Sequence, residues 1–307
     1  MSAWLGRGKV ILLGEHAVVY GHAALAGALD RGVTCTLAPG PLRLRVPAWH
    51  LDVGADDDHP VAAALRAVAD ALGARPDVSL DAVAALPAAA GLGSSAAMAV
   101  AVTRALAAAL DRPLDDEQVI AIASAAERCF HGNPSGVDVA LATCGGLGLY
   151  RRGAGLQAIH ADDGGALRVP LAIAIDRTPR STAALVAKVA AARAAGAGAD
   201  DDLRALGLAA ERGARLCARR DLAGLGALFD DAHARLARLG VSTPALDRLC
   251  AIARDAGATG ATLTGAGGGG AVIAIAPGRE DAIVAAWQAQ GVTAFACAVG
   301  HVVEEAR

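Results

Sequence analysis

Glycines and serines gather in the run from Pro87 to Ala97, which reads PAAAGLGSSAA. Glycine accepts a positive φ and leaves neighbouring backbone N–H groups uncovered. The Ala-rich continuation to Leu110 predicts a helix, and backbone donors at a helix start attract anions. The run therefore predicts a loop that binds the phosphates of a nucleotide, with these members: Pro87, Gly91, Leu92, Gly93, Ser94, Ser95 and Ala96. No Gly-Lys-Ser/Thr follows the glycines, so the loop is not of the Walker type.

A second glycine run, TLTGAGGGGA at 262–271, formally satisfies the G-x-G-x-x-G pattern. A dinucleotide site needs a strand before this pattern and a helix after it. Here the apolar stretch Ala271–Ala276 predicts a strand instead, which excludes NAD. Two interpretations remain: a plain tight hairpin, or a backbone wall beside the nucleotide in which Gly267 and Gly268 take part.

Two carboxylates and one lysine are candidates for acid–base and metal chemistry. Glu127 falls late in a predicted helix, where its charge opposes the helix dipole, so a purely structural role is unfavourable there. Its other interpretation is an ion pair with Arg128 or with another base at the surface. Asp138 follows a turn-rich loop, which could hold a carboxylate at a pocket edge or simply use it as a cap. Lys9 starts a predicted strand, and a lone lysine is usually solvated.

Three segments match, in order, the three motifs of the GHMP small-molecule kinases: KVILLGEHAVVYG at 9–21, PAAAGLGSSAA and TLTGAGGGGA. The first is most similar to the corresponding segment of the mevalonate kinases. The similarity extends to ERCFHGNPSGVD at 127–138 and to DRTPRSTAALVAKV at 176–189, and so spans most of the chain.

The resemblance implies a kinase that uses ATP and Mg²⁺ to phosphorylate the C5 hydroxyl of (R)-mevalonate in isoprenoid biosynthesis. It gives Asp138 the role of accepting the proton of the attacking hydroxyl, with Lys9 offsetting phosphate charge. Ser95 and Glu127 become Mg²⁺ ligands, and Ser94 a loop residue near the phosphates. Either serine could instead only cap the helix.

The implied substrate is an anion, so its pocket needs positive charge or aligned donors. Arg180 offers a bidentate fork for a carboxylate, and Ser181 and Thr182 begin a predicted helix. The alternative pairs Arg180 with a surface acid and leaves the hydroxyls as caps. The resemblance also places Glu15 and His16 beside the substrate or the nucleotide edge.

One position departs from the resemblance, because Thr262 stands where mevalonate kinases commonly carry lysine, and its side chain is expected to be peripheral. Two other functions stay open: another GHMP kinase with a different small alcohol, and a catalytically silent nucleotide-binding member. A galactokinase would carry Glu-His-Thr-Asp in the first motif, whereas this chain has Ala17 and Val18 after His16.

The resemblance implies an α+β, two-domain GHMP kinase fold. It has an N-terminal ribosomal-protein-like α/β domain at 1–165 and a C-terminal ferredoxin-like domain at 166–307, with the boundary in the Gly/Asp-rich stretch 161–166. Hydrophobic residues make up 54% of the 307 residues but aromatics only 3%, so the core must be built from Ala, Val and Leu.

Patterning and turn residues predict the elements one by one. Strands are expected at 9–13, 23–29, 32–37, 42–46, 78–83, 171–176, 259–264, 271–276 and 292–299. Helices are expected at 60–72, 116–130, 182–195, 203–219, 222–239, from Thr243-Pro244 to before Gly257, and at 279–290. Without the inserted helices, the second half reads β-α-β-β-α-β, a ferredoxin-like order.

Composition also limits the partners. The net charge is −3 with no sustained basic block, so no nucleic acid is expected. The apolar stretch 88–110 contains Arg104 and fits a packed helix better than a membrane span. The six cysteines form no Cys-x-x-Cys pair, which favours buried thiols in a reducing, cytoplasmic location. A homodimer is compatible with the sequence, which does not determine the oligomeric state.

Overall fold

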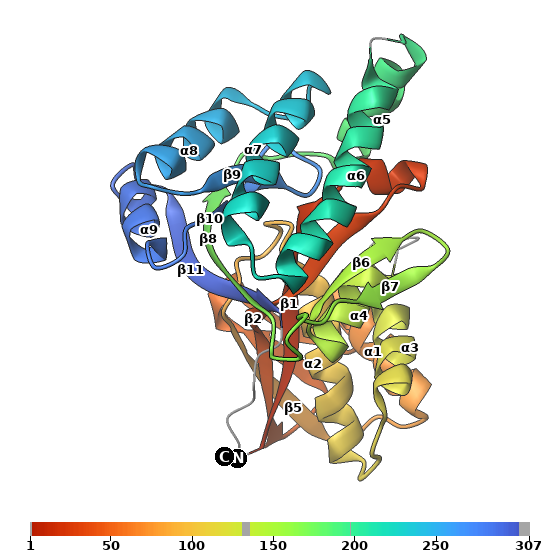
Figure 1. Cartoon of the computed structure of the whole chain (residues 1–307). Coiled ribbons are helices and arrows are strands. Elements are labelled where there is room, and N and C mark those ends of the chain that lie inside the picture. The colour runs from red at the N-terminus through yellow and green to blue at the C-terminus, as the bar shows by residue number, and fades with distance from the viewer. Residues whose placement is uncertain (1, 131–135, 197, 301–307) are drawn as a thin grey trace. The chain divides into compact units, whose positions relative to one another are not determined.

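The structure, a computed structural model, describes residues 2–130, 136–196 and 198–300. Its contacts divide the chain into two compact units (Figure 1). The first contains residues 1–9 and 31–145, and the second contains 10–30 and 146–307. The domain boundary expected at 161–166 lies inside the second unit.

The first unit is built on a mixed sheet. Its strands lie in the order β4-β3-β5-β2, with β1 paired to β2. Their bounds are β1 Ala3–Leu13, β2 Ala24–Pro39, β3 Arg43–Val46, β4 Leu51–Gly54 and β5 Val78–Ala84, with the 3₁₀ turn η2 at Pro47–Trp49. Strands β3 and β5 run parallel, and the other pairings around them are antiparallel. The helical crossover between β3 and β5 allows the parallel pair.

The described residues of this unit also form four helices: α1 Pro60–Leu72, α2 Ser94–Ala109, α3 Asp116–Glu127 and α4 Val137–Cys144. Helix α1 starts with Pro60 behind a capping His59 and ends at Gly73 in the left-handed conformation. Helix α3 begins with a capping box, in which Asp115 and Gln118 exchange hydrogen bonds. Local chemistry therefore sets both helix starts where the sequence predicts them.

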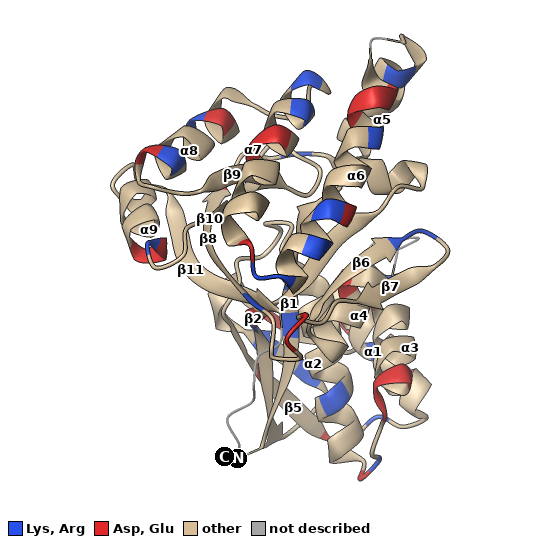
Figure 2. Ribbon diagram, viewed as in Figure 1, with Lys and Arg blue, Asp and Glu red and all other residues tan. Residues whose placement is uncertain are grey.

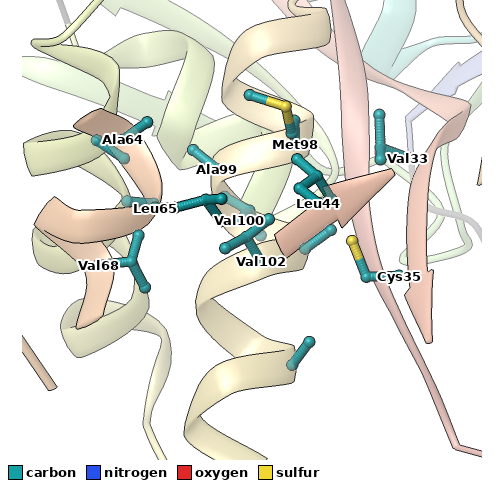
Figure 3. Close-up of a cluster of buried hydrophobic side chains, with 14 of the residues drawn as sticks. Val33, Cys35, Leu44, Ala64, Leu65, Val68, Met98, Ala99, Val100 and Val102 are labelled. Carbon is teal, nitrogen blue, oxygen red and sulfur yellow. The ribbon is translucent and has the colours of Figure 1, made fainter. Parts of the chain in front are cut away.

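Helix α2 is the centre of the first core. Residues 96–103 are all buried, as expected for a helix that is apolar on every side. In Figure 3, Met98, Val100 and Val102 lie between side chains of α1 and of the sheet. Small alanines on the same helix allow this close packing, so a core with very few aromatic residues still fills its volume.

The second unit carries an antiparallel sheet in the order β2-β11-β8-β10-β9. Its strands are β8 Arg168–Asp176, β9 Gly260–Thr264, β10 Gly270–Ile275 and β11 Thr293–Gly300, and the hairpin β6 Leu147–Arg151 with β7 Gly155–Ala158 pairs with β2. Four of these strands lie side by side in the order β11-β8-β10-β9, which is the order of a ferredoxin-like sheet. The second half therefore has the predicted strand order.

In the part of this unit that the structure describes, five α-helices and one 3₁₀ turn accompany the strands. They are η1 Ala17–Tyr20, α5 Thr182–Ala194, α6 Ala199–Ala218, α7 Leu222–Arg238, α8 Pro244–Asp255 and α9 Glu280–Gln288. Helices α7 and α8 pack on β9 and β10, and α9 packs on β8 and β11. Blue and red segments are mixed along α7 and α8 in Figure 2, which agrees with the absence of a basic block in the sequence.

Several expectations differ from the structure. The strands expected at 23–29 and 32–37 are one continuous strand, β2. Helix α3 ends at Glu127 rather than Phe130, and the expected stop, Gly132, lies outside the described residues. Strands β4, β6 and β7 and helix α4 were not predicted. Within the described part of the chain, no helix is both long and apolar enough to cross a membrane.

Candidate active site

The predicted phosphate loop leads directly into helix α2. Gly93 is the N-cap residue, at a φ of 71°, and supplies no side-chain cap, so Ser94 and Ser95 are the first helical residues. The interpretation of these serines as mere caps is therefore not supported by their position. Ala89 also has a positive φ, 58°, a strained conformation for an alanine. Such strain is concentrated at functional turns.

Close packing explains why the loop needs Gly93. A Cβ at this position would lie 2.7 Å from Cγ of Lys9. The backbone N–H of Lys9 donates to the carbonyl of Leu92 over 2.9 Å. The loop and the lysine of the first motif are therefore in direct contact, although they are far apart in the sequence.

Lys9 and Asp138 form an ion pair, with Nζ 3.3 Å from Oδ2. Lys9 is only 8% exposed, so it is not the solvated lysine that general statistics predict. Asp138 lies in the first turn of α4 and not in a loop. The preceding residues Asn133–Ser135 of the motif lie outside the described part of the chain.

Glu127 is the last residue of α3 and is 2% exposed. Helix α2 packs on α3, and the short link at 110–115 makes the two helices antiparallel neighbours. The start of α2, with Ser95, is therefore at the same end of the pair as Glu127. The burial of Glu127 argues against a solvent-exposed ion pair at the surface.

Hydroxyl and carboxylate oxygens are ligands that Mg²⁺ accepts, and this ion takes few protein ligands beside phosphates. Ser95 and Glu127 therefore fit a Mg²⁺ site in which substrate phosphates complete the coordination. The described residues contain no group of three or more His, Cys, Asp or Glu side chains suited to a metal.

The second unit carries the rest of the first motif. Glu15 and His16 are buried, and His16 has a φ of 59°. Nε2 of His16 lies 2.9 Å from the carbonyl oxygen of Ala266, inside the third motif, and donates to it. Burial lowers the pKa of His16, and the hydrogen bond to Ala266 opposes this. A neutral imidazole with its proton on Nε2 satisfies this contact.

The third motif is the turn between β9 and β10, so the hairpin interpretation is correct as far as the local fold goes. Gly267 has a φ of 80°, and a Cβ there would collide with the carbonyl oxygen of Val241. The N–H of Gly268 donates to the same carbonyl over 2.8 Å. The turn is thus held by the link between α7 and α8, and the side chain of Leu185 packs against Gly268.

Arg180 lies against this glycine turn. Its Nη1 donates to the carbonyls of Gly269 at 2.7 Å and of Gly267 at 3.3 Å. The pairing with a surface acid therefore does not occur, although Asp176 is close enough to counteract the lowering of the Arg180 pKa by burial. Ser181 caps α5 by accepting from the N–H of Ala184 over 3.3 Å, and Thr182 is exposed as the first helical residue.

A cavity of about 380 Å³ in the second unit lies elsewhere, between α8 and the end of β8. Its lining includes Arg177, Arg248 and Leu249 and none of the residues predicted for the site. The volume of a cavity alone therefore does not locate the predicted site residues of this unit.

Comparison with known proteins shows the family to which the chain belongs. The family profile "GHMP kinases N terminal domain" matches residues 59–146, and "GHMP kinases C terminal" matches 214–293. Mevalonate kinase of Aeropyrum pernix is 35% identical over 87% of this chain and 86% of its own, and that of Pyrococcus abyssi is 31% identical over 93% and 91%. The chain belongs to the mevalonate kinase family of GHMP kinases.

A solved structure of a family member shows how far the fold extends. The crystal structure of L. major mevalonate kinase in complex with R-mevalonate has a TM-score of 0.87 and 28% identity, and covers 98% of this chain and 96% of its own. The expected two-domain GHMP kinase fold is therefore confirmed. Lactococcus lactis galactokinase shares the fold alone, at a TM-score of 0.73 and 18% identity.

Two features of this family member were missed from the sequence. Thr262, expected to be peripheral, is fully buried, and its Oγ1 donates to the carbonyl of Leu263. Val241, which holds the glycine turn through its carbonyl, carries no signal in its side chain. Contacts made by a backbone oxygen depend on the fold and not on residue type, so a motif search cannot reveal them.

Proposed function

We propose that this chain transfers the γ-phosphoryl group of ATP to the C5 hydroxyl of (R)-mevalonate, giving 5-phosphomevalonate for isoprenoid biosynthesis. The ion pair between Lys9 and Asp138 beside the start of α2 carries this proposal. It places a carboxylate and a lysine beside the backbone N–H groups at the start of α2, all in one unit. Relatives named mevalonate kinase and a related structure with bound R-mevalonate support the choice of substrate.

Phosphoryl transfer depends mainly on positioning and on electrostatic stabilisation. In the proposed mechanism the N–H groups at Gly93, Ser94, Ser95 and Ala96 bind phosphate oxygens, and Pro87, Gly91 and Leu92 shape that loop. Asp138 takes the proton of the attacking hydroxyl. Lys9 balances the negative charge on the phosphoryl group during transfer.

Mg²⁺ would be held by Ser95 and Glu127 and would neutralise phosphate charge when bound. Gly267 and Gly268 would offer their backbone to the nucleotide side of the site. Both roles are proposals from the chemistry of these groups and from family resemblance.

The proposed mevalonate site uses Arg180, Glu15, His16, Ser181 and Thr182. Only Nη1 of Arg180 hydrogen bonds to the glycine turn in the described contacts, so the opposite edge of the guanidinium can receive a carboxylate. Because Ser181 already caps α5, its contribution would come from its position at the helix start. None of the six cysteines forms a disulfide, which supports the proposed reducing, cytoplasmic location. The expectation of buried thiols is correct for four of them, whereas Cys129 and Cys144 are exposed. A homodimer remains a prediction.

A coupled assay of ADP release tests the proposal with mevalonate, phosphomevalonate, galactose, homoserine and no added substrate. Mevalonate should give turnover far above the other four conditions. Higher turnover with another alcohol would assign the chain to a different GHMP reaction. ATP binding without turnover on any of them would favour the silent, nucleotide-binding alternative.

A further inference from the structure

Strand β9 is the outer strand of the sheet in the second unit, since only β10 pairs with it in the strand order. The outer edge of such a strand presents backbone N–H groups at every second residue. Ala261 and Leu263 are two residues apart and both are fully buried. Their N–H groups therefore need acceptors that no strand provides, because a buried donor without an acceptor is costly.

Helix α7 supplies both acceptors from its side chains. Oδ1 of Asp230 accepts from the N–H of Ala261 over 3.0 Å, and Nδ1 of His233 accepts from the N–H of Leu263 over 3.3 Å. Residues three apart lie on one face of a helix. The two side chains thus replace a neighbouring strand along this edge.

The acceptors are themselves fixed by α8. Arg254 donates to Asp230 over 2.7 Å and to the carbonyl of Ala261 over 3.2 Å, which closes a small ring of contacts. Nε2 of His233 lies 3.0 Å from Oδ1 of Asp247. With its proton on Nε2, His233 donates to Asp247 and keeps Nδ1 as an acceptor.

The same pair of helices also holds the far side of the glycine turn. Leu263 lies two residues before Gly265, where the turn begins, and Gly268 is bound by the carbonyl of Val241 in the link after α7. Both ends of the turn are therefore attached to the α7–α8 hairpin. A shift of β9 at this edge would move the backbone that is proposed to face the nucleotide.

We propose that Asp230 and His233 are positioning residues that hold the edge of β9 and thereby fix the glycine turn for ATP binding. The kinetic part of this inference rests on the proposed kinase activity. Its structural part, the protection of the Ala261 and Leu263 amides from hydrogen exchange, does not depend on that activity.

His233→Leu removes the acceptor at Nδ1, whereas His233→Asn places an amide oxygen close to the same position. In the full chain, we expect His233→Leu to speed hydrogen exchange of the Leu263 amide by about tenfold, as for one lost net hydrogen bond. We expect KM for ATP to rise about fivefold or more with kcat within twofold, and His233→Asn to restore both values. Unchanged exchange and KM in His233→Leu would overturn the proposal, as would an Asn variant as impaired as the Leu variant.

Asp230 gives an independent pair of variants if His233→Leu does not fold, because its side chain is 40% exposed. Asp230→Ala should speed exchange of the Ala261 amide and raise KM for ATP, and Asp230→Asn should retain most of the protection. Asp231→Ala is the matched control, since Asp231 pairs with Arg235 on the same helix and has no recorded contact with β9. An equal rise of KM in the Asp231 variant would refute the positioning role. If the chain has no kinase activity, the hydrogen-exchange rates of the Ala261 and Leu263 amides alone test the proposal.

Discussion

Nζ of Lys9 and Oδ2 of Asp138 lie 3.3 Å apart, joining the strand of the first motif to the first turn of α4. A lysine that is 8% exposed requires such a partner, because an isolated buried charge is strongly unfavourable. Asp138 is more exposed than Lys9, so its carboxylate remains accessible to a substrate hydroxyl. This geometry agrees with the proposed role of Asp138 as the proton acceptor, with Lys9 as a positive charge beside it.

Asp138→Asn should lower kcat for mevalonate by ~10²-fold or more, because an amide cannot accept the hydroxyl proton. ATP affinity, measured by calorimetric titration, should change little. Asp81→Asn serves as the control, since Asp81 pairs with Arg45 at an exposed position in the same unit. A kcat near that of the wild type for Asp138→Asn would remove this residue from the mechanism.

Ser95→Ala removes a hydroxyl oxygen, and Glu127→Gln removes the negative charge of the carboxylate. Each variant should therefore raise the Mg²⁺ concentration that gives the half-maximal rate. A titration of rate against Mg²⁺ at saturating ATP measures this. Glu117→Gln is the control for α3, since Glu117 is exposed in the first turn of that helix. Identical titrations for wild type and both site variants would exclude this metal assignment.

Arg180→Lys keeps the charge but loses the planar fork, so KM for mevalonate should rise more than KM for ATP. The loss of one charged hydrogen bond corresponds to roughly 1.5–3 kcal/mol, or about 10- to 100-fold in KM. Arg177→Lys is the control, because Arg177 is exposed three residues earlier in the same segment. If Arg180→Ala retains the wild-type KM for mevalonate, the carboxylate binds elsewhere, and His16 is the next residue to vary.

Local chemistry made much of the fold predictable. Helix α1 has the predicted bounds, and α8 begins at Pro244 behind a capping Thr243 as expected. Proline, cap residues and terminal glycines act within a few residues of themselves, so a sequence reveals them directly. The ferredoxin-like order of the second half followed from the same signals.

Other parts of the fold and of the site depend on long-range contacts, which limited their prediction from the sequence. The continuous strand β2 was divided because Asp30 and Arg31 interrupt its apolar pattern, but Asp30 is accommodated by Arg168 at 3.8 Å. Helix α4 is short and follows Gly136, so the sequence has no clear helical pattern at this point. The family resemblance implied that Lys9 lies near Asp138, as the ion pair shows. The contact of Arg180 with backbone carbonyls depends on the folded chain, so the sequence indicated this residue but not its partners.

Stability should fall with acidification because burial lowers the pKa of both His16 and His233. Asp247 and Asp230 oppose this at His233, whereas Arg254 reinforces it, and the Cys250 thiol packs 3.5 Å from its Nδ1. In the unfolded chain these histidines bind protons at about pH 6.5, whereas in the folded chain burial disfavours their protonated form. Stability is therefore full above about pH 6.5 and declines below it, until the lowered folded pKa is reached.

Each such histidine adds at most about 1.4 kcal/mol per pH unit to this slope, because one proton is taken up on unfolding. Denaturant unfolding of wild type and His233→Asn between pH 8 and pH 5 measures the effect. The variant should show a shallower decline than the wild type. Parallel curves would mean that His233 does not resist protonation in the folded chain.

Gly93→Ala and Gly73→Ala form a matched pair that separates backbone strain from contact with Lys9. The two glycines have φ values of 71° and 73°, so an alanine suffers similar strain at both, about 1–2 kcal/mol. At Gly73 the new Cβ meets nothing within 4 Å, whereas at Gly93 it lies 2.7 Å from Cγ of Lys9. Both variants should lose thermal stability, but only Gly93→Ala should also displace Lys9 and lower kcat, by about tenfold or more if Lys9 stabilises the transferring phosphoryl group. Equal kcat values in the two variants, measured at a temperature where both are folded, would show that the packing of Gly93 against Lys9 does not matter for turnover.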